Sequence, residues 1–394
     1  MKRQLMPQLA RLISSNTLLK LKRSFTELKR GVTQQPYTMD VFLQINDPYS
    51  YLLVQTLPDI AERYNVNLRL RTIYQVNLEM FPEQEMWENN AFSDALRLAS
   101  LYGLAMPKLP PKKTEPRIQH YTNQLVNNET SCNSLDMFKR IFDNYWHQDD
   151  LEQPNISTAD APSNNTIIKH NEALLQRLGH YMAAMIYFGG EWYWGVDRLD
   201  HFEIRANELG LAKYESSVVY DRTYADFCKG PEVLPSSARL DANTLTLFFS
   251  IRSPYSHIGL ERAVVLAEHY KVELVVKPVL PMMMRGLSVP NSKKMYIFHD
   301  TKREAQKYGI NYGYVADPLG AGVERCYALF EYAASQGKSI EYLLAYARAV
   351  NAEGIRSETD RGLKKILLSC GLDWQTAKPL LKNKSWNIWA DKHL

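Results

Sequence analysis

The chain has 394 residues, 45% of them hydrophobic and 23% charged, so it is long enough for two or three globular domains with substantial cores. Its net charge of +4 implies no nucleic-acid-binding surface on the body of the protein. The sequence contains no apolar run long enough for a signal peptide or for a membrane-spanning helix.

The first segment, residues 1–37, is basic and is expected to be helical or flexible. Residues 1–31 hold eight Lys or Arg and one Glu. Apolar residues recur on this basic background: Leu5, Leu9, Leu12, Ile13, Leu18, Leu19, Leu21 and Phe25. The pattern fits a membrane-surface helix, an organellar presequence, a helix packed on the first domain, or a frayed tail.

Residues 38–213 predict a first α/β domain. Its expected elements are a strand at 38–45, a helix at 50–65, a strand at 67–76, a helical region at 84–178 with loops at 107–116 and 153–165, a hairpin at 182–194 and a helix at 197–209. Two residues, Gly189 and Gly190, form the expected hairpin turn. This order describes a thioredoxin fold with an inserted helical domain.

Residues 214–243, with several prolines and serines, predict a linker to a second domain at 244–394. The expected elements of that domain are a strand at 244–251, a helix at 254–270, a strand at 272–279, and helices at 293–308, 319–336, 339–352, 358–370 and 374–391. The sequence reaches Leu394 without a second hairpin. We therefore expect the second domain to lack its C-terminal hairpin and helix.

An internal repeat relates the two domains. Asp47-Pro48-Tyr49-Ser50 and Ser253-Pro254-Tyr255-Ser256 each follow a strand-like run and precede an apolar-periodic segment. Adding 206 to the first copy's numbers gives the second without a gap, and the register continues from Asp94 to Leu104 onto Asp300 to Ile310. The ungapped repeat predicts two copies of one fold that pack as a pseudo-two-fold pair. A homodimer or a pseudo-dimer of the two repeats is the expected assembly.

Cysteine and histidine spacing argues against two kinds of site. Cys132, Cys228, Cys326 and Cys370 lie far apart and form no Cys-x-x-Cys pair, so the sequence predicts no dithiol redox site and favours a reducing cytoplasm. The histidines show no metal-ligand spacing, and we expect no metal.

The Ser253 turn is the strongest candidate for chemistry. Ser253 stands at the N-cap of the expected helix and Pro254 at its first position. A hydroxyl there lies beside free backbone N–H groups at the positive end of the helix dipole, which suits an anion or a thiolate. A plain helix cap is the alternative interpretation.

These residues carry a resemblance. The Ser253-Pro254-Tyr255-Ser256 turn, the pattern from Lys293 through Tyr296 and Asp300 to Arg303, and the Gly195-x-Asp197-Arg198 turn resemble 2-hydroxychromene-2-carboxylate isomerases and kappa-class glutathione transferases, of the DsbA-like thioredoxin superfamily. The resemblance implies two DsbA-like domains and glutathione as cofactor. It further implies that Ser253 holds the glutathione thiolate, and that the cofactor is bound by Ser253, Pro254, Tyr255, Asn291, Lys293, Tyr296, Asp197 and Arg198.

Two departures affect the first copy. Asp47 stands where the family has its serine, and Ala184 where the family has a cis-proline before the third strand. A carboxylate would repel a thiolate 4 Å away by roughly 4 kcal/mol at an effective dielectric near 20. We therefore predict that Asp47 is a structural N-cap with a lowered pKa, and not an acid or base.

Three functions remain open. The first is a glutathione-dependent isomerase or transferase acting on a small electrophilic or aromatic substrate, with Tyr255, Tyr296 and Met282–Met284 lining the pocket. The alternative is a tandem DsbA-like scaffold or binding protein whose sites have decayed. The third, a thiol–disulfide oxidoreductase, is disfavoured by the missing Cys-x-x-Cys. His257 is expected to be a satisfied or solvent-facing histidine.

Overall fold

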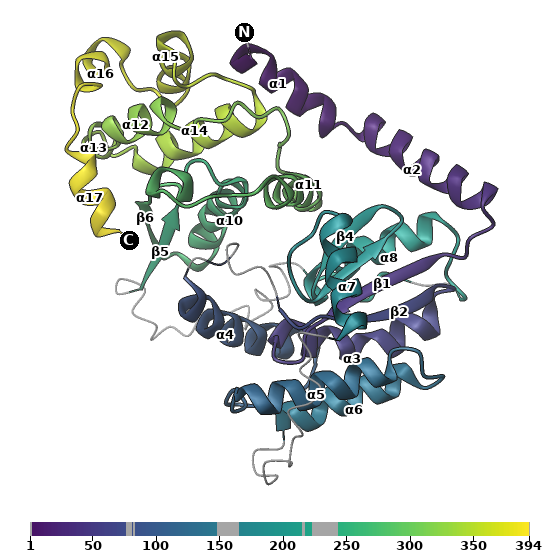
Figure 1. Ribbon diagram of the computed structural model, residues 1–394. Coiled ribbons are helices and arrows are strands. Elements are labelled where there is room, and N and C mark those ends of the chain that lie inside the picture. Colours follow the sequence, from purple (N-terminus) through teal and green to yellow (C-terminus); the bar gives the residue numbers. More distant parts are fainter. Residues whose placement is uncertain are drawn as a thin grey trace. The chain divides into compact units, whose positions relative to one another are not determined.

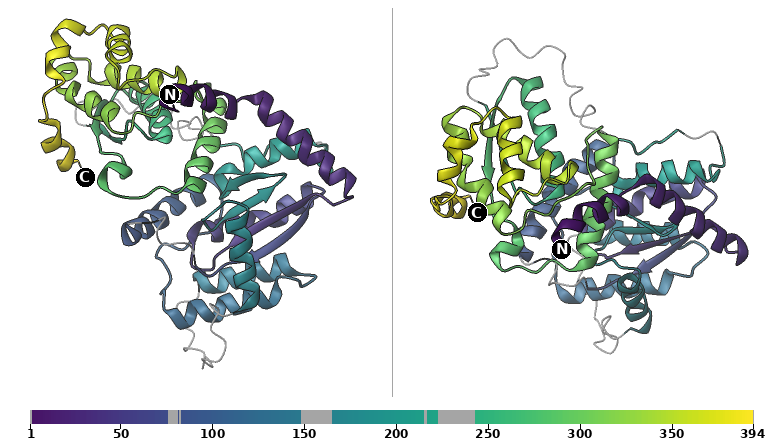
Figure 2. Two further views of the ribbon diagram at one scale, coloured as in Figure 1. Left: turned by 45° about the horizontal axis from the view of Figure 1, so that its top comes forward. Right: turned by 90° about the horizontal axis from the view of Figure 1, so that it is seen from above.

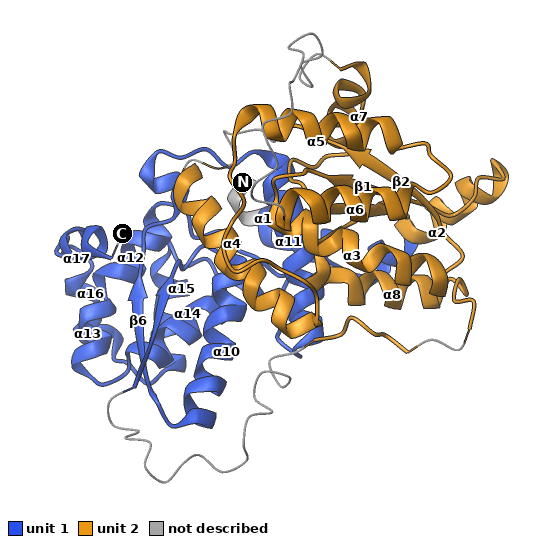
Figure 3. Cartoon of the chain, turned by 90° about the horizontal axis from the view of Figure 1, so that it is seen from below, with its two compact units in different colours: residues 1–21, 233–394 blue, residues 22–232 orange. Residues whose placement is uncertain are grey.

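A computed structural model describes residues 2–75, 81, 83–147, 165–214, 217–222 and 243–393, with side chains from residue 5 onward (Figure 1). The chain forms two compact units (Figure 3). Unit 1 comprises Met1–Leu21 with Val233–Leu394, and unit 2 comprises Lys22–Glu232. The expected loop at 153–165 lies almost wholly outside the described residues, as does most of the expected linker at 214–243.

Unit 2 is built on a four-stranded sheet in the order β2-β1-β3-β4. The strands are β1 (Thr38–Leu43), β2 (Asn67–Thr72), β3 (Met185–Phe188) and β4 (Glu191–Trp194). β1 runs parallel to β2 and antiparallel to β3, and β3 pairs with β4 through the two-residue turn. Gly189 and Gly190 adopt positive φ there, as a tight hairpin turn requires. The hairpin predicted from the sequence is confirmed.

Helices cover this sheet. They are α2 (Asn16–Val32), which continues from unit 1, then α3 (Pro48–Arg63), α4 (Gln84–Tyr102), α5 (Glu115–Asn128), α6 (Ser134–His147), α7 (Thr166–Arg177), the 3₁₀ turn η3 (Val196–Arg198) and α8 (Leu199–Glu208). Leu52, Leu53 and Leu57 of α3 are fully buried in one core with Val41 and Leu43 of β1. Burial of such side chains stabilises the unit by roughly 2 kcal/mol each.

Unit 1 has a two-stranded parallel sheet, β5 (Thr244–Phe249) and β6 (Glu273–Pro278), within its described residues. Its helices are α1 (Lys2–Ile13), α10 (Pro254–Tyr270), η5 (Met282–Arg285), α11 (Asn291–Lys307), α12 (Ala321–Ala328), α13 (Phe330–Ser335), α14 (Ser339–Ala352), α15 (Asp360–Ser369), α16 (Trp374–Leu380) and α17 (Trp386–Lys392). The apolar faces of α10 and of the helices from α12 to α17 meet in a second core that includes Leu343, Tyr346 and Leu363.

Two long helices expected in unit 1 are each divided. The helix expected at 319–336 is interrupted at Leu329, between α12 and α13. The helix expected at 374–391 is interrupted between α16 and α17, where the Asn383 side chain accepts a hydrogen bond from Ser385 N at 2.8 Å. Such a local turn competes with helical hydrogen bonding.

The β-α-β segments of the two units share an equivalent strand register and one equivalent backbone hydrogen bond. β1 and β2 pair from Thr38↔Asn67 onward, and β5 and β6 pair from Thr244↔Glu273 onward, so the two registers differ by 206 at each position. The backbone N–H of Gln44 points at Ser50 Oγ, at 3.2 Å, as that of Ser250 points at Ser256 Oγ, at 3.4 Å.

The N-terminal helix α1 packs on the C-terminal part of the chain, within unit 1. Ser14 is buried, and its Oγ donates to Gly313 O at 3.0 Å. Gly313 has a φ of +120°, and a side chain there would collide with Ser14. Of the alternatives for residues 1–37, a helix packed on the first domain is therefore wrong for α1, because its docking partner is the loop at Gly313.

Candidate active site

Asp47 caps helix α3 in unit 2, as predicted. Its backbone is extended, Pro48 follows at the first helical position, and its Oδ2 accepts hydrogen bonds from Ser50 N at 2.8 Å and Ser50 Oγ at 2.7 Å. The residue is only 7% exposed. Asp47 is therefore a buried carboxyl group at the start of a helix that contributes side chains to the core of its unit.

The predicted direction of the Asp47 pKa is wrong. Burial raises the pKa of Asp47 to about 6, against the lowering contributed by its hydrogen bonds to Ser50. Removal from water disfavours the charged form, and at this site that penalty exceeds the stabilisation by the cap. A carboxyl group with this pKa changes protonation near neutral pH, as a general acid or base must.

A cavity of about 370 Å³ opens at Asp47. Aromatic rings form much of its wall, and Tyr49 lies 4.8 Å from Trp194 and 6.4 Å from Trp87, centroid to centroid. Phe81 extends this wall, 4.7 Å from Trp87. Flat apolar walls beside the Asp47 carboxyl group suit a small aromatic ligand.

Polar groups on the same wall lack partners within the described residues. Asn46 Oδ1 and Trp194 Nε1 are both buried without a hydrogen-bond partner there, and both residues line the cavity. Leaving such a group unpaired costs about 1–3 kcal/mol, which a bound ligand can recover. Glu88 and Lys113, paired at 2.7 Å, also line the cavity. These residues were not predicted from the sequence, because nothing in their spacing brings them to Asp47.

The loop before β3 forms another part of the cavity. Met182 and Ala183 line it. Ala184, where the sequence resemblance implies a cis-proline, is fully buried with a φ of +54°, and no cis peptide bond occurs among the described residues. A non-glycine residue in this conformation costs about 1 kcal/mol or more and persists where the surroundings impose it.

Asp197 and Arg198, predicted to receive glutathione, follow β4 in η3 of unit 2. They pair with each other at 2.8 Å, and neither is among the residues that line the cavity. The preceding Gly195 takes a φ of +61° and donates its N–H to Ala184 O at 2.9 Å. The turn thus connects to the strained loop at Ala184.

The Ser253 turn lies in unit 1 and caps α10 as predicted. Ser253 Oγ accepts from Ser256 N at 3.3 Å, and Pro254 occupies the first helical turn. Tyr255 donates from its hydroxyl to Asp300 Oδ2 at 2.7 Å. Tyr49 makes the equivalent bond to Asp94 Oδ2 at 2.9 Å in unit 2. The two turns therefore share a cap and an anchored tyrosine, and differ in the capping group.

The other residues predicted for unit 1 are on or near α11. Asn291 is its exposed first residue, while Lys293 and Tyr296 are half-buried one turn further on. Burial lowers the pKa of Lys293. Met282–Met284 lie in η5, in which Met284 packs against the core. His257 is buried, and burial lowers its pKa, so it is a core histidine.

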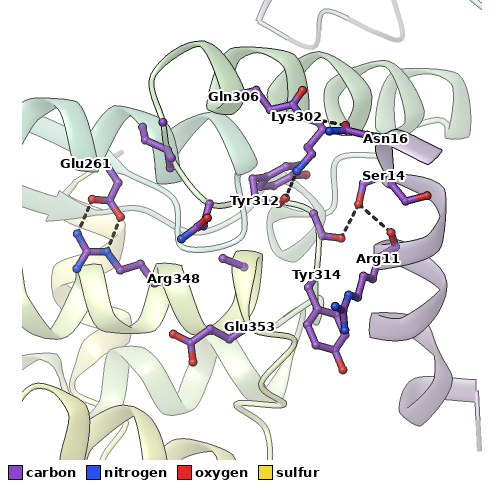
Figure 4. A pocket seen from close by; sticks show the side chains of 16 residues that line it. Arg11, Ser14, Asn16, Glu261, Lys302, Gln306, Tyr312, Tyr314, Arg348 and Glu353 are labelled. Carbon is purple, nitrogen blue, oxygen red and sulfur yellow. Dashed lines mark hydrogen bonds and ion pairs between the residues drawn. The ribbon is translucent and has the colours of Figure 1, made fainter. Parts of the chain in front are cut away.

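A larger cavity of about 990 Å³ lies elsewhere in unit 1 and was not predicted (Figure 4). Helix α1 and its neighbours contribute Arg11, Ser14 and Asn16, and α11 contributes Lys302, whose Nζ donates to Tyr312 O at 2.7 Å. Arg348 and Glu261 form a bidentate ion pair at one side. Ser253 is not among the lining residues.

Among the described cysteines, Cys132 is exposed, Cys326 is buried and Cys370 is half-buried, and all three are free thiols. Cys228 lies outside the described residues. Within the described residues, no group of His, Cys, Asp or Glu could hold a metal ion. The same residues include no helix with both the length and the apolar content to cross a bilayer.

The chain was compared with curated proteins, solved structures and protein-family models. No curated protein matches the chain. A solved 2-hydroxychromene-2-carboxylate isomerase is similar at 17% identity and a TM-score of 0.34, covering 44% of this chain and 96% of its own. A candidate protein disulfide isomerase from Nitrosomonas europaea is similar at 14% identity and a TM-score of 0.30, covering 38% and 75%. Neither likeness bears on chemistry. Residues 244–387 match the family model of the DSBA-like thioredoxin domain, so the C-terminal part of the chain carries a domain of this family.

Proposed function

We propose that unit 2 binds a small aromatic molecule in the cavity at Asp47 and isomerises it by proton transfer. The observation that supports this most is the buried Asp47 carboxyl on the cavity wall, with a pKa raised by burial to about 6. An acid or base is most effective when its pKa lies near the working pH.

Different residues of the cavity bind the ligand and transfer the proton. Tyr49, Trp87 and Trp194 hold the ring of the ligand by apolar contact. Asn46 Oδ1 accepts a hydrogen bond from the ligand and Trp194 Nε1 donates one, so the favoured class carries a hydroxyl beside a carbonyl. Asp47 Oδ2 is held by Ser50, which leaves Oδ1 to carry the proton.

The proposed reaction conserves atoms and electrons. The Asp47 carboxylate takes a proton from one atom of the ligand, and the electron pair left behind shifts into a new double bond. The carboxylic acid then returns the proton to a second atom of the same ligand, and the carboxylate is regenerated. The product is an isomer of the substrate, and no oxidant or reductant is needed.

A second candidate is glutathione binding at Ser253, the function that the sequence resemblance implies. It is favoured by the family match over 244–387, which includes Ser253, and by the half-buried Lys293. Ser253 is uncharged and half-exposed and fits a thiolate, whereas the buried Asp47 does not. Ser253 and Lys293 would hold the tripeptide, with Tyr255 and Tyr296 nearby. Glutathione supplies a thiolate nucleophile when bound.

We also infer that the two units descend from one repeated DsbA-like domain of the isomerase and kappa-transferase type. The shared register offset of 206 and the paired Tyr49–Asp94 and Tyr255–Asp300 bonds support this inference. In this line of descent, the first copy kept the helix cap and exchanged a serine for an aspartate.

One assay separates the candidates. Isomerisation of 2-hydroxychromene-2-carboxylate would be followed by absorbance with and without glutathione, in the full chain and in Asp47→Asn and Ser253→Ala variants. We expect turnover without glutathione that falls about 10²–10⁴-fold in Asp47→Asn and is unchanged in Ser253→Ala. The matched control is Asp373→Asn, which alters an exposed helix cap and is expected to leave the rate unchanged.

The other outcomes have distinct meanings. Turnover that requires glutathione and is lost in Ser253→Ala would contradict the proposal for Asp47 and support the second candidate. Turnover that neither substitution changes would contradict both. Absence of turnover together with absence of ligand quenching of tryptophan fluorescence would favour the scaffold or binding protein.

A further inference from the structure

Helix α2 is docked on unit 2 through its polar face. Arg23 pairs with Glu191 of β4 at 2.7 Å and with Glu208 of α8 at 3.0 Å. Arg30 donates to the Tyr37 hydroxyl at 2.8 Å, and its guanidinium stacks on that ring. Arg23 and Arg30 therefore face the protein, Arg23 toward β4 and α8. Figure 2 shows the ribbon of α2, in purple, from two further sides.

The apolar face of α2 points outward. Leu21, Phe25, Leu28 and Val32 are 62%, 69%, 64% and 76% exposed, and no residue of the helix is buried. Their spacing of four, three and four residues places them in one line along the helix. An amphipathic helix on a globular domain normally buries this line, so α2 has the reverse orientation.

We call the line formed by Leu21, Phe25, Leu28 and Val32 the apolar stripe. The exposed charged side chains beside it are positive. Lys20, Lys22 and Lys29 are exposed, and helical geometry places them on the flanks of the stripe. Glu27, the one acidic residue of α2, is half-buried and pairs with Arg30 at 3.0 Å and with Arg205 at 3.7 Å. Among the described residues, the outward surface of α2 therefore combines exposed apolar side chains with exposed positive charge.

Helix α1 repeats the arrangement within unit 1. It is attached by Ser14 and by Gln8, which donates to the Tyr314 hydroxyl at 3.3 Å. Leu5, Leu9 and Leu12 are exposed on it at the same helical spacing. Two successive helices are thus fixed by polar contacts and leave their leucines uncovered.

We propose that the apolar stripe of α2 binds the surface of an anionic lipid bilayer, lying parallel to it. Phe25, Leu28 and Val32 enter the boundary between headgroups and acyl chains, while the lysines contact anionic headgroups. A protein partner would need a long apolar groove with an acidic rim, whereas a bilayer of anionic lipid supplies both features along its whole surface. The inference is independent of the reaction proposed for Asp47.

Vesicle co-sedimentation of the full chain tests the proposal. Vesicles of phosphatidylcholine alone would be compared with vesicles containing phosphatidylserine. We expect binding to the anionic vesicles that weakens as salt is raised, because salt screens the lysines. Phe25→Ser and Leu28→Ser should each weaken binding about tenfold, and Lys22→Ala or Lys29→Ala about fivefold. The matched control is Leu109→Ser, which removes a 77% exposed leucine from a loop of the same unit and should bind as the unchanged chain does.

Three results would overturn the proposal. One is failure of the unchanged chain to bind anionic vesicles at low salt. Another is binding that Leu109→Ser weakens as much as Phe25→Ser does. The third is a dimer, seen by analytical ultracentrifugation, that Phe25→Ser dissociates while vesicle binding stays the same, since the stripe would then cover a second copy of the chain. Circular dichroism of each variant verifies that it folds.

Discussion

Replacing Asp47 by Asn is expected to stabilise unit 2 at pH 8 by about 2–3 kcal/mol and to change nothing at pH 4. The pKa of Asp47 is about 6 in the folded chain and about 4 in an unfolded one. Between these values the folded state holds a proton that the unfolded state has lost, so stability falls as pH rises and remains lower above pH 6. Asn keeps the cap and removes the buried charge.

Native-state amide hydrogen exchange measures this change in the free energy of unfolding for each unit separately. Asp373→Asn is the matched control, because Asp373 caps α16 in the same way, accepting from Thr376 N at 2.6 Å, but is exposed and has a lowered pKa. We expect that control to be no more stable than the unchanged chain at pH 8. A loss of stability in Asp47→Asn at pH 8 would mean that the Asp47 charge stabilises the fold.

The largest loss of stability is expected for Arg63→Met, at about 3–5 kcal/mol in unit 2. Arg63 lies at the end of α3, and its Nη1 meets Glu203 Oε1 at 2.6 Å. The Glu203 side chain is fully buried, and its Oε2 accepts from Val219 N and Tyr220 N. Without Arg63, the buried Glu203 carboxyl group loses the cation that α3 provides. Loss of this partner lowers the free energy of unfolding far more than loss of an exposed ion pair does.

A double-mutant cycle isolates that ion pair. Glu203→Gln keeps an acceptor for the two backbone N–H groups and removes the charge, so Arg63→Met combined with Glu203→Gln should recover most of the loss. Urea unfolding followed through the hydrogen exchange of α3 and α8 measures each variant. A loss below about 1 kcal/mol for Arg63→Met would show that the pair behaves as a surface pair does.

Local signals in the sequence predicted the elements around both turns. The Ser253-Pro254 step marks the start of α10 so clearly that its bounds, Pro254–Tyr270, agree with the prediction. By the internal repeat, the same signal also predicted a helix after Asp47, which is α3. The Gly189-Gly190 turn likewise predicted β3 and β4.

The cavity at Asp47 could not be predicted, because its walls come from distant parts of the chain. Trp87 of α4 and Trp194 of β4 both line the cavity with Asp47, although they are far apart in the sequence. These side chains exclude the water that would keep the carboxyl ionised, so the pKa is a property of the fold. From the sequence, the helix cap alone was visible.

The sequence also did not predict which face of α2 contacts the protein. The spacing of Leu21, Phe25 and Leu28 predicts an amphipathic helix but does not indicate which face meets the protein. That choice depends on Glu191 and Glu208, more than 160 residues away, which attract Arg23. The docking of α1 on Gly313 depends on a contact between residues 299 positions apart.

The pKa of Asp47 is the most direct test of the proposed function. The full chain would be labelled with ¹³C at the aspartate carboxyl carbons and titrated by nuclear magnetic resonance, with Asp47→Asn used to assign the signal. We expect a midpoint near pH 6, and a shift of that midpoint when an aromatic hydroxy-carbonyl ligand binds. A midpoint below pH 4 would contradict it, because Asp47 would then be an ionised cap and unable to exchange protons near neutral pH.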